Sequence, residues 1–367
     1  MRGKGILAVC LGLVLALSLS GCGYPELYER VIIHGIGVDW DGQGYQVTVR
    51  SSASAEDEGE ELFTCRGSTV LEALSNLSLS TGREPFYSHN YLVVFGMECA
   101  RRGLDDCLDF FVRYYNTRPA VKMFLAEGSA QAVIATEKDG KRMKMSELQA
   151  LGQGGRYNGQ AAEVEILDFV NGVKAEGSSP VLPVLRPGED GVEVAGTAYF
   201  NGYQFAGTLN RSQTRGWLAA MDQLRMGELT VDGEEIGTVT LSLRNVSGKI
   251  SPELQGRPVF QIEVGVDADI SSADRSQTQR AEFYANLEAA ARELIENEVR
   301  EAVRESVERG GCDIFGFGNQ IYKEFPEYWR ENGADWPVLM KACQYRVSAD
   351  VKVRRLEQEN RTGLEEP

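Results

Sequence analysis

The sequence contains very few histidines and none of the familiar catalytic or nucleotide-binding motifs. Only His34 and His89 occur in 367 residues, so a mechanism that needs imidazole ligands or an imidazole base has little to draw on. The motifs HExxH, GxSxG and GxGxxG and the P-loop lysine motif are absent from the sequence, which removes the usual signatures of metalloproteases, α/β-hydrolases and nucleotide-binding domains. We therefore predict that the protein is not an enzyme and holds no metal or cofactor.

Cysteine is also scarce, and its spacing fits neither a zinc site nor a disulfide framework. The chain has no CxxC pair. Its seven cysteines are Cys10, Cys22, Cys65, Cys99, Cys107, Cys312 and Cys343. The five beyond residue 22 are an odd number, and we expect most of them to be small buried side chains. A bridge between Cys312 and Cys343 is an alternative that the last domain leaves open.

Long hydrophobic runs are confined to the amino terminus. Two basic side chains precede the apolar residues 6–19, which are too few to span a bilayer, and Ser20 and Gly21 stand directly before Cys22. This order is typical of a bacterial lipoprotein signal. In such a signal, small residues let the extended chain fit the peptidase, and the cysteine thiol accepts a diacylglyceryl group.

We predict that residues 1–21 are a lipoprotein signal peptide and that residues 22–29 form a lipidated tether. Each methylene of an acyl chain such as palmitate contributes about 0.8 kcal/mol when buried, so two or three chains on Cys22 hold a protein durably at a membrane. A buried helix, or a signal that is cleaved without lipidation, is the alternative.

Basic side chains are the minority: there are 38, against 54 acidic ones, and the net charge is −16. Nucleic acid and anionic lipid surfaces repel a protein of this charge. We therefore predict no nucleic-acid partner and a solvated acidic surface. Among so many carboxylates some pairs arise by chance, and no spacing singles out an acid and a base.

Residues 30–140 alternate between strand-like and helix-like segments, which predicts an N-terminal α+β domain. The strand-like segments are residues 30–38, 45–50, 91–95 and 120–125, and the helix-like segments are residues 69–79 and 104–115. The turn-forming residues 39–44 join the first two strands into a predicted hairpin.

Residues 141–250 are predicted to form a middle α+β region built on hairpins. The glycine-, glutamine- and lysine-rich residues 137–162 indicate a flexible connection or an exposed excursion. Helices are predicted at residues 164–173 and 212–224, and hairpin turns at Asn201-Gly202 and Asp232-Gly233.

The clearest pattern belongs to residues 251–356. Apolar and polar residues alternate over residues 260–270 and 345–353, so each predicted strand has one buried face. Residues 279–309 between them have the spacing of a long amphipathic helix. Pro326 should begin a new turn, or kink the helical run that follows. These features predict a C-terminal α+β domain whose long helix packs against a sheet.

The fold class predicted for the whole chain is therefore α+β, with several domains, mixed or antiparallel sheets and packed helices. Residues 357–367 are charged and are predicted to be a disordered tail.

A glycine-rich turn and an aromatic stripe follow the long helix. Phe317, Phe325 and Trp329 are spaced by multiples of four, and Gly316 and Gly318 flank Phe317. An aromatic stripe at helical spacing is more often core than ligand cage. We expect Gly316, Phe317, Gly318 and Trp329 to position two helices or to form an interface.

Short blocks along the whole chain carry a family resemblance. They are the signal ending at Cys22, Ile36-Gly37-Val38-Asp39, Ser88-His89, residues 104–111, Gly196-Thr197-Ala198-Tyr199-Phe200, Gly207-Thr208-Leu209, Asp313-Ile314-Phe315-Gly316-Phe317-Gly318, Pro326-Glu327-Tyr328-Trp329 and residues 347–355. In order and spacing these blocks resemble the Ger(x)C lipoproteins, the C subunits of GerA-type spore germinant receptors. Members of that family commonly carry Trp-Asp directly after the lipidated cysteine, whereas Gly23-Tyr24 stands there in this chain.

The resemblance implies a non-catalytic, three-domain α+β lipoprotein on the outer face of the inner spore membrane. It implies assembly with a multi-pass A subunit and a transporter-like B subunit that binds the nutrient germinant, and a role in receptor assembly or signalling during spore germination.

Two rival functions remain open at this level. A membrane-anchored solute-binding lipoprotein of an importer would have two similar α/β lobes around a cleft. A surface-anchored hydrolase would need an acid, base or metal set, for which the sequence offers only scattered carboxylates and His34 or His89.

Overall fold

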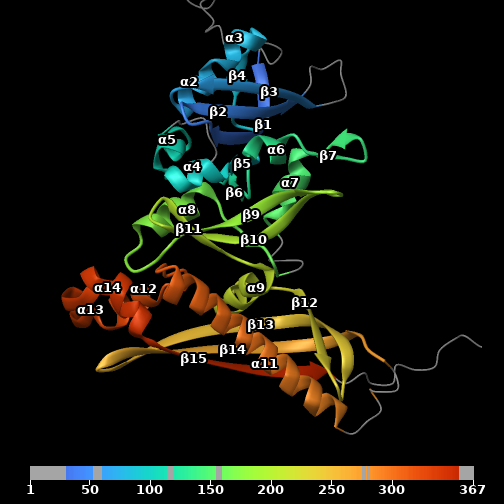
Figure 1. The fold of residues 1–367 in the computed structure, drawn as a ribbon, viewed down its shortest axis with the longest axis vertical. Coiled ribbons are helices and arrows are strands. Elements are labelled where there is room, and N and C mark those ends of the chain that lie inside the picture. Colours follow the sequence, from blue (N-terminus) through green and yellow to red (C-terminus); the bar gives the residue numbers. More distant parts are fainter. Residues whose placement is uncertain are drawn as a thin grey trace, which may run out of the picture.

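The structure, a computed structural model, describes residues 30–52, 60–113, 120–153, 159–274, 278 and 282–354. The predicted signal peptide, the tether with Cys22 and the predicted tail lie outside these residues. The described chain forms two main sheets at opposite ends of a long axis, with helices beside and between them (Figure 1). This mixture of helices and sheets confirms the predicted α+β class.

The first sheet is mixed and has the strand order β11-β10-β9-β6-β5-β1-β2-β3, with β4 paired to the start of β1. Its strands are β1 (Arg30–Trp40), β2 (Tyr45–Ser52), β3 (Glu60–Gly67), β4 (Glu84–Phe86), β5 (Leu92–Phe95), β6 (Lys122–Ala126), β9 (Val181–Gly188), β10 (Gly191–Asn201) and β11 (Gln204–Leu209). The central strands β1, β5, β6 and β9 run parallel to one another. Every residue of β5 and β6 is buried, as expected for parallel strands covered on both faces.

The hairpin predicted at residues 39–44 is confirmed. The Oδ1 atom of Asp41 accepts hydrogen bonds from the amides of Gln43 (3.0 Å) and Gly44 (2.9 Å). Gly42 has a φ of +95°, a conformation that glycine adopts without strain. These residues therefore fix the register between β1 and β2.

Short helices cover both faces of the first sheet. They are α2 (Val70–Ser75), α3 (Leu77–Thr81), α4 (Met97–Arg102), α5 (Asp105–Arg113), α6 (Ala130–Ile134), α7 (Met145–Leu151) and α8 (Ile166–Lys174). The single helix predicted at residues 69–79 is wrong in one respect, because the chain forms two helices that meet at Asn76. The side-chain amide of Asn76 donates to the carbonyl oxygen of Arg66 (2.8 Å), which ties the break to β3.

Of the two alternatives for residues 137–162, the flexible connection is wrong for most of the described part, and the exposed excursion describes only the start of the segment. Glu137–Lys138 (β7) and Lys141–Arg142 (β8) form a small hairpin, and α7 buries Met145 and Leu148 completely. Met145, Leu148 and the partly buried Leu151, each three apart, are a short signal for the helix, and the surrounding polar residues hide their pattern. The helix covers one face of the first sheet.

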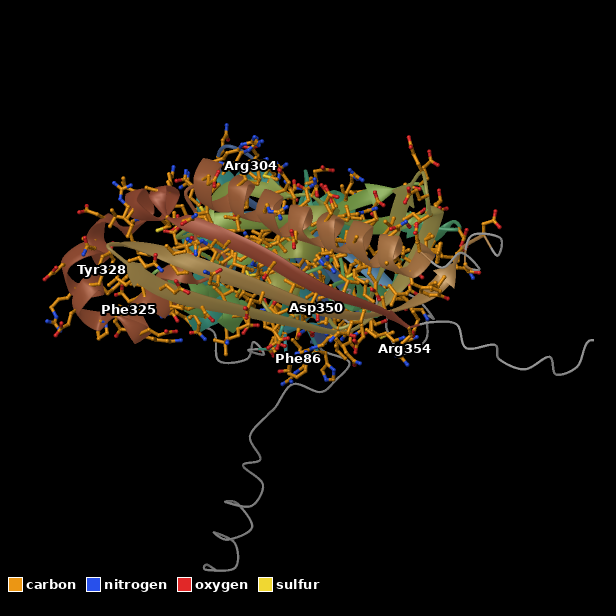
Figure 2. The ribbon with its side chains drawn as sticks, turned by 90° about the horizontal axis from the view of Figure 1, so that it is seen from below. Phe86, Arg304, Phe325, Tyr328, Asp350 and Arg354 are labelled. Atoms are coloured by element: carbon orange, nitrogen blue, oxygen red, sulfur yellow. The ribbon has the colours of Figure 1, made fainter. Side chains whose placement is uncertain are left out.

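The second sheet has the strand order β12-β13-β14-β15. Its strands are β12 (Gly227–Gly233), β13 (Gly237–Gln255), β14 (Arg257–Ser272) and β15 (Gln344–Arg354). The predicted alternation in residues 260–270 and 345–353 is confirmed by their burial pattern. The other face is polar, and Figure 2 shows it from below with Asp350 and Arg354 on β15. Residues 141–250 thus divide between the two sheets.

The hairpin between β12 and β13 turns later than predicted. Asp232 and Gly233 still belong to β12 and pair with Thr238 and Gly237. The connection is residues 234–236, and Gly237 has a φ of +67°. A three-residue loop followed by a left-handed glycine is a common alternative to the two-residue turn. Gly237 supplies that glycine, so the chain forms the longer loop.

The long helix predicted at residues 279–309 is confirmed in its described part. It consists of α11 (Phe283–Val303) and a π-helical turn, Arg304–Arg309. Its apolar stripe covers the inner face of the second sheet, and α9 (Arg211–Ala220) packs between α11 and the first sheet (Figure 1). A Cβ atom on Gly216 of α9 would lie 2.5 Å from the carbonyl carbon of Glu298, so the two helix backbones touch.

Short helices follow α11 and extend beyond the end of the second sheet (Figure 1). They are α12 (Phe317–Glu324), α13 (Pro326–Asn332) and α14 (Trp336–Leu339), with 3₁₀ turns at Gly333–Asp335 and Met340–Ala342. Pro326 begins α13, as predicted. Its fixed φ suits the first helical position, where the missing amide has no intrahelical partner.

The five cysteines of the described chain are free thiols. Cys312 and Cys343 therefore do not form the bridge that their positions left open. Cys65, Cys99, Cys107 and Cys312 are buried, as expected for small apolar side chains.

Candidate functional site at the junction of the two sheets

Asp313 is the centre of the junction between the two sheets. Its carboxylate is buried and accepts hydrogen bonds from the amides of Phe317 (2.9 Å) and Gly318 (2.7 Å) and from Nε1 of Trp336 (3.0 Å). Burial raises the pKa of Asp313 to about 6, although these three donors oppose the rise. The carboxylate caps the first turn of α12 and fixes α14 against it.

The backbone around Asp313 is bonded to the loop that precedes β9. Ser179 Oγ accepts a hydrogen bond from the amide of Asp313 (3.0 Å), and the Ser179 amide donates to the Asp313 carbonyl (2.8 Å). The amide of Asn319 donates to the carbonyl of Gly177 (3.1 Å). The C-terminal helices are therefore attached directly to the first sheet, through residues far apart in the sequence.

Two positions of the predicted turn require glycine, each for a different geometric reason. Gly316 has a φ of +68°, a left-handed conformation that disfavours side chains. Gly318 is packed face to face with another glycine: a Cβ atom there would lie 2.7 Å from Cα of Gly177 and 2.8 Å from Cδ1 of Trp336. Neither contact distance is available to a real Cβ atom.

The aromatic residues form one cluster around this turn. The Phe317 ring centroid lies 4.5 Å from that of Phe260 on β14 and 4.8 Å from that of Tyr345 on β15. Trp329 lies 5.7 Å from Trp336. The structure thus brings Gly316, Phe317, Gly318 and Trp329 together: Phe317 and Gly318 are buried, and Gly316 and Trp329 are half-buried.

Helix α9 supplies the other side of the junction. Nε1 of Trp217 donates to the carbonyl of Ile314 (3.0 Å). Arg215 donates two hydrogen bonds to the carboxylate of Glu298 on α11. Glu298 is only 5% exposed. Burial raises the pKa of Glu298, and the neighbouring guanidinium opposes the rise. A buried pair of this kind fixes α9 on α11 only while both partners remain.

Sequence reasoning missed Asp313, Ser179, Trp217 and Trp336 as junction residues. The contacts that join these residues across the junction span 23 to 134 positions along the chain, so no local spacing could have identified them. Only the bonds from the Phe317 and Gly318 amides to Asp313 are local. The one available signal was the Asp313 to Gly318 block of the family resemblance.

A cleft of about 660 Å³ opens beside the junction. Apolar groups of α8, β9 and α9 line it, together with Ile314 and a charged group on its rim. In that group, Nζ of Lys122 donates to Glu163 (2.9 Å) and Glu165 (2.8 Å). Burial lowers the pKa of Lys122, but the two carboxylates outweigh it and raise the pKa above its usual value. A lysine held charged in this way is unsuited to act as a nucleophile or base.

The two histidines lie away from this cleft. His34 is 3.4 Å from Ser52 Oγ through Nε2 and 3.7 Å from Glu60 through Nδ1, an arrangement that superficially resembles a hydrolase triad. Glu60, however, is bonded to the buried guanidinium of Arg50, and 3.7 Å is too long for the hydrogen bond that orients a catalytic imidazole. His89 is exposed and lies beside the ring of Phe86.

Within the described ranges, no group of three His, Cys, Asp or Glu side chains has the geometry of a metal site. The described helices also include none with the length and hydropathy needed to cross a bilayer.

Comparisons with known proteins match nearly the whole chain. Residues 23–187 match the family described as the spore germination protein N-terminal domain, and residues 195–357 match the family described as spore germination B3/GerAC like, C-terminal. Spore germination protein KC of Bacillus subtilis (strain 168) is 23% identical and aligns over 97% of this chain and 96% of its own length. Spore germination protein B3 of the same organism is 21% identical, over 92% and 95%.

A solved structure has the same fold. The crystal structure of the GerBC protein superposes with a TM-score of 0.58 and 17% identity, covering 87% of this chain and 96% of that chain. At this identity the likeness concerns the fold alone.

Proposed function

This chain belongs to the GerAC-like family of spore germination proteins, and from that premise we propose that it is a non-catalytic lipoprotein subunit of a spore nutrient germinant receptor. The observation that carries the proposal is the match to the two family domains, in order, over most of the chain. The proposed partners are the A and B integral-membrane subunits, and the proposed location is the outer face of the inner spore membrane, held by lipid on Cys22.

The proposed role is to hold a fixed body beside the membrane subunits. A lipid anchor confines the protein to one surface and so raises its effective concentration near partners in that surface. The junction supports this role because two hydrogen bonds between Asp313 and Ser179 tie the segment that leads into the C-terminal helices to the loop before β9 of the first sheet. When the two sheets are joined in this way, a partner that pushes on one end of the protein displaces both sheets together.

The importer alternative finds less support in the structure. A solute-binding protein of that kind would close two similar α/β lobes on its ligand. Here the two sheets differ, with nine described strands in one and four in the other, and no residue of the four-stranded sheet lines the cleft. The hydrolase alternative lacks a convergent set around the cleft, since neither His34 nor His89 lines it.

Replacing Cys22 with alanine tests the anchor directly. We expect Cys22→Ala to move the protein from the membrane to the soluble fraction of broken spores and to abolish nutrient-triggered germination, measured as loss of optical density. Cys10→Ala is the matched control, because Cys10 lies in the predicted signal peptide. It should leave both readouts unchanged, and heat-resistant spore counts should be equal in the two strains.

Copurification tests the receptor assignment separately. When spore membranes are gently solubilised, the tagged protein should elute with two multi-pass proteins. A protein that travels alone, or a purified sample that turns over a substrate, contradicts the proposal. So does firm membrane attachment of the Cys22→Ala variant.

A further inference from the structure

The outermost helices of the first sheet carry exposed leucines. Leu79 on α3 is 83% exposed, more than any other large hydrophobic side chain of the described chain, and Leu71 on α2 is 50% exposed. Between α2, α3 and β4 lies a depression of about 390 Å³ whose walls include Leu71, Tyr87 and Phe110. We call this surface, from Leu71 to Gly82 with the depression beside it, the α2–α3 end (Figure 1).

The α2–α3 end is uncharged where it is most exposed. Residues 73–82 contain no Asp, Glu, Lys or Arg, in a chain where 25% of residues are charged. The carboxylate of Glu72 accepts from the amide of Ser68 (2.7 Å), and Arg83 is paired with Glu61 (2.9 Å). Residues 73–82 can therefore contact an apolar partner without removing a charge from water, while the exposed carboxylate of Glu84 at the depression stays hydrated.

The hydroxyl groups of this surface are bonded within it. Ser75 donates to the carbonyl of Leu71 (2.8 Å), Ser78 to that of Ser75 (2.8 Å), and both Ser80 (3.0 Å) and Thr81 (2.9 Å) to that of Leu77. A hydroxyl that already has an acceptor is much less costly to desolvate than one that water satisfies. The surface is therefore polar in composition, but its desolvation costs little.

The α2–α3 end is also the part of the body beside the start of β1. Strand β4 pairs with Arg30 and the two residues after it, and the Arg30 guanidinium lies 4.9 Å from the Phe86 ring centroid. Arg30 is eight residues from Cys22, a separation of about 29 Å at full extension. With lipid on Cys22, the start of β1 is held within that distance of the membrane, and the second sheet lies at the far end of the long axis (Figure 1).

We infer that the α2–α3 end contacts the lipid surface, with Leu79 and Leu71 inserted between headgroups. The inference rests on the lipid anchor of the proposed function and adds the orientation of the body on the membrane. The net charge of −16 supports lipid as the occupant, because an anionic leaflet repels the acidic faces and leaves the uncharged end as the one that approaches. Two leucines add little affinity alone, and the anchor supplies the proximity.

Fluorescence quenching from the membrane tests this orientation. The full acylated chain, with Cys343→Ala to remove the half-buried thiol, carries an environment-sensitive fluorophore on Leu79→Cys or Leu71→Cys. Val338→Cys is the matched control, since Val338 is 73% exposed and lies on α14 near the second sheet. Each protein is reconstituted in phosphatidylglycerol and phosphatidylcholine vesicles whose acyl chains carry nitroxide quenchers.

We expect blue-shifted emission and loss of intensity at positions 79 and 71, and neither change at position 338. Equal emission at all three positions, on protein that mass spectrometry shows to be acylated, overturns the inference alone. If quenching at position 79 occurs only when the multi-pass partners are present, the surface binds protein instead of lipid, and the inference is also overturned. A mature amino terminus without acyl groups overturns the anchoring on which both proposals depend.

Discussion

Replacing Gly318 with alanine should loosen the junction by an amount that its packing allows to be estimated. The new Cβ would lie 2.7 Å from Cα of Gly177 and 2.8 Å from Cδ1 of Trp336, and overpacking of this kind costs about 1–3 kcal/mol. The indole must move to relieve it, which weakens its bond to the Asp313 carboxylate, an interaction worth about 1.5–3 kcal/mol. Alanine returns up to about 1 kcal/mol of helix propensity. We therefore expect the free energy of unfolding to fall by about 2–4 kcal/mol.

Urea unfolding followed by tryptophan fluorescence measures this change where it occurs, because three of the four tryptophans, Trp217, Trp329 and Trp336, lie at the junction. The protein is the full chain with Cys22→Ala. Gly316→Ala is the matched control: its Cβ would meet nothing closer than 3.9 Å, so only the left-handed backbone contributes, about 1 kcal/mol.

A double-mutant cycle with Trp336→Phe adds a second test, since Nε1 of the Trp336 indole would also clash with the new Cβ. The losses from Gly318→Ala and Trp336→Phe should be less than additive by about 0.5–3 kcal/mol. If Gly318→Ala is no more destabilising than Gly316→Ala, or if the two junction changes are strictly additive, the backbone at Gly318 is not closely packed against Gly177 and Trp336.

The remaining predictions concern buried charges. Burial raises the pKa of Asp313 to about 6, above the value of an exposed aspartate, so the native state binds its proton more tightly. Stability should therefore fall by roughly 3 kcal/mol as the pH rises from about 4 to 7, and urea melts of Asp313→Asn should lack this slope. Arg215→Met leaves Glu298 buried without its cation, and the urea midpoint at pH 7 should drop by the equivalent of about 3 kcal/mol. The exposed pair Arg304–Glu301 is the control, and Arg304→Met should change stability by less than about 1 kcal/mol. Equal effects of the two arginine changes, or a pH slope that survives in Asp313→Asn, would contradict these readings.

Local pattern predicted the elements whose own residues decide their structure. The alternation in residues 260–270 and the spacing of residues 279–309 each correspond to a described element, because burial on one face leaves a fixed period in the sequence. The first hairpin followed from Asp41 and Gly42 for the same reason. Where two turn chemistries compete, as at Gly233 and Gly237, a short-range pattern cannot choose between them.

Tertiary context decided what local pattern could not. Helix α7 depends on Met145 and Leu148 reaching a sheet face that is built by strands distant in the sequence. The junction has the same character, since Gly318 requires glycine because Gly177 and the indole of Trp336 lie opposite it. The sequence identified Gly316, Phe317, Gly318 and Trp329 through spacing and resemblance, but their common centre, Asp313, emerges only when both sheets are in place.

The glutamates of α11 have a role that a solvated helix face does not explain. Glu296 is ion-paired with Arg300, as i to i+4 spacing predicts, yet its Oε1 also accepts from the amide of Ala349 (3.1 Å). Glu288 accepts from the amide of Val353 (2.9 Å). Both amides point away from β14, along the outer edge of the second sheet.

An uncovered edge strand of eleven residues offers unpaired amides to any other strand, and this is a recognised route to unwanted association. Carboxylates placed over two of those amides occupy the donors and put negative charge where a second backbone would approach. For a protein whose proposed anchor concentrates it on one surface, such protection matters more than in dilute solution. These carboxylates oppose the addition of a partner strand at the edge of β15. We therefore expect partner proteins to bind through side-chain surfaces instead of through this edge.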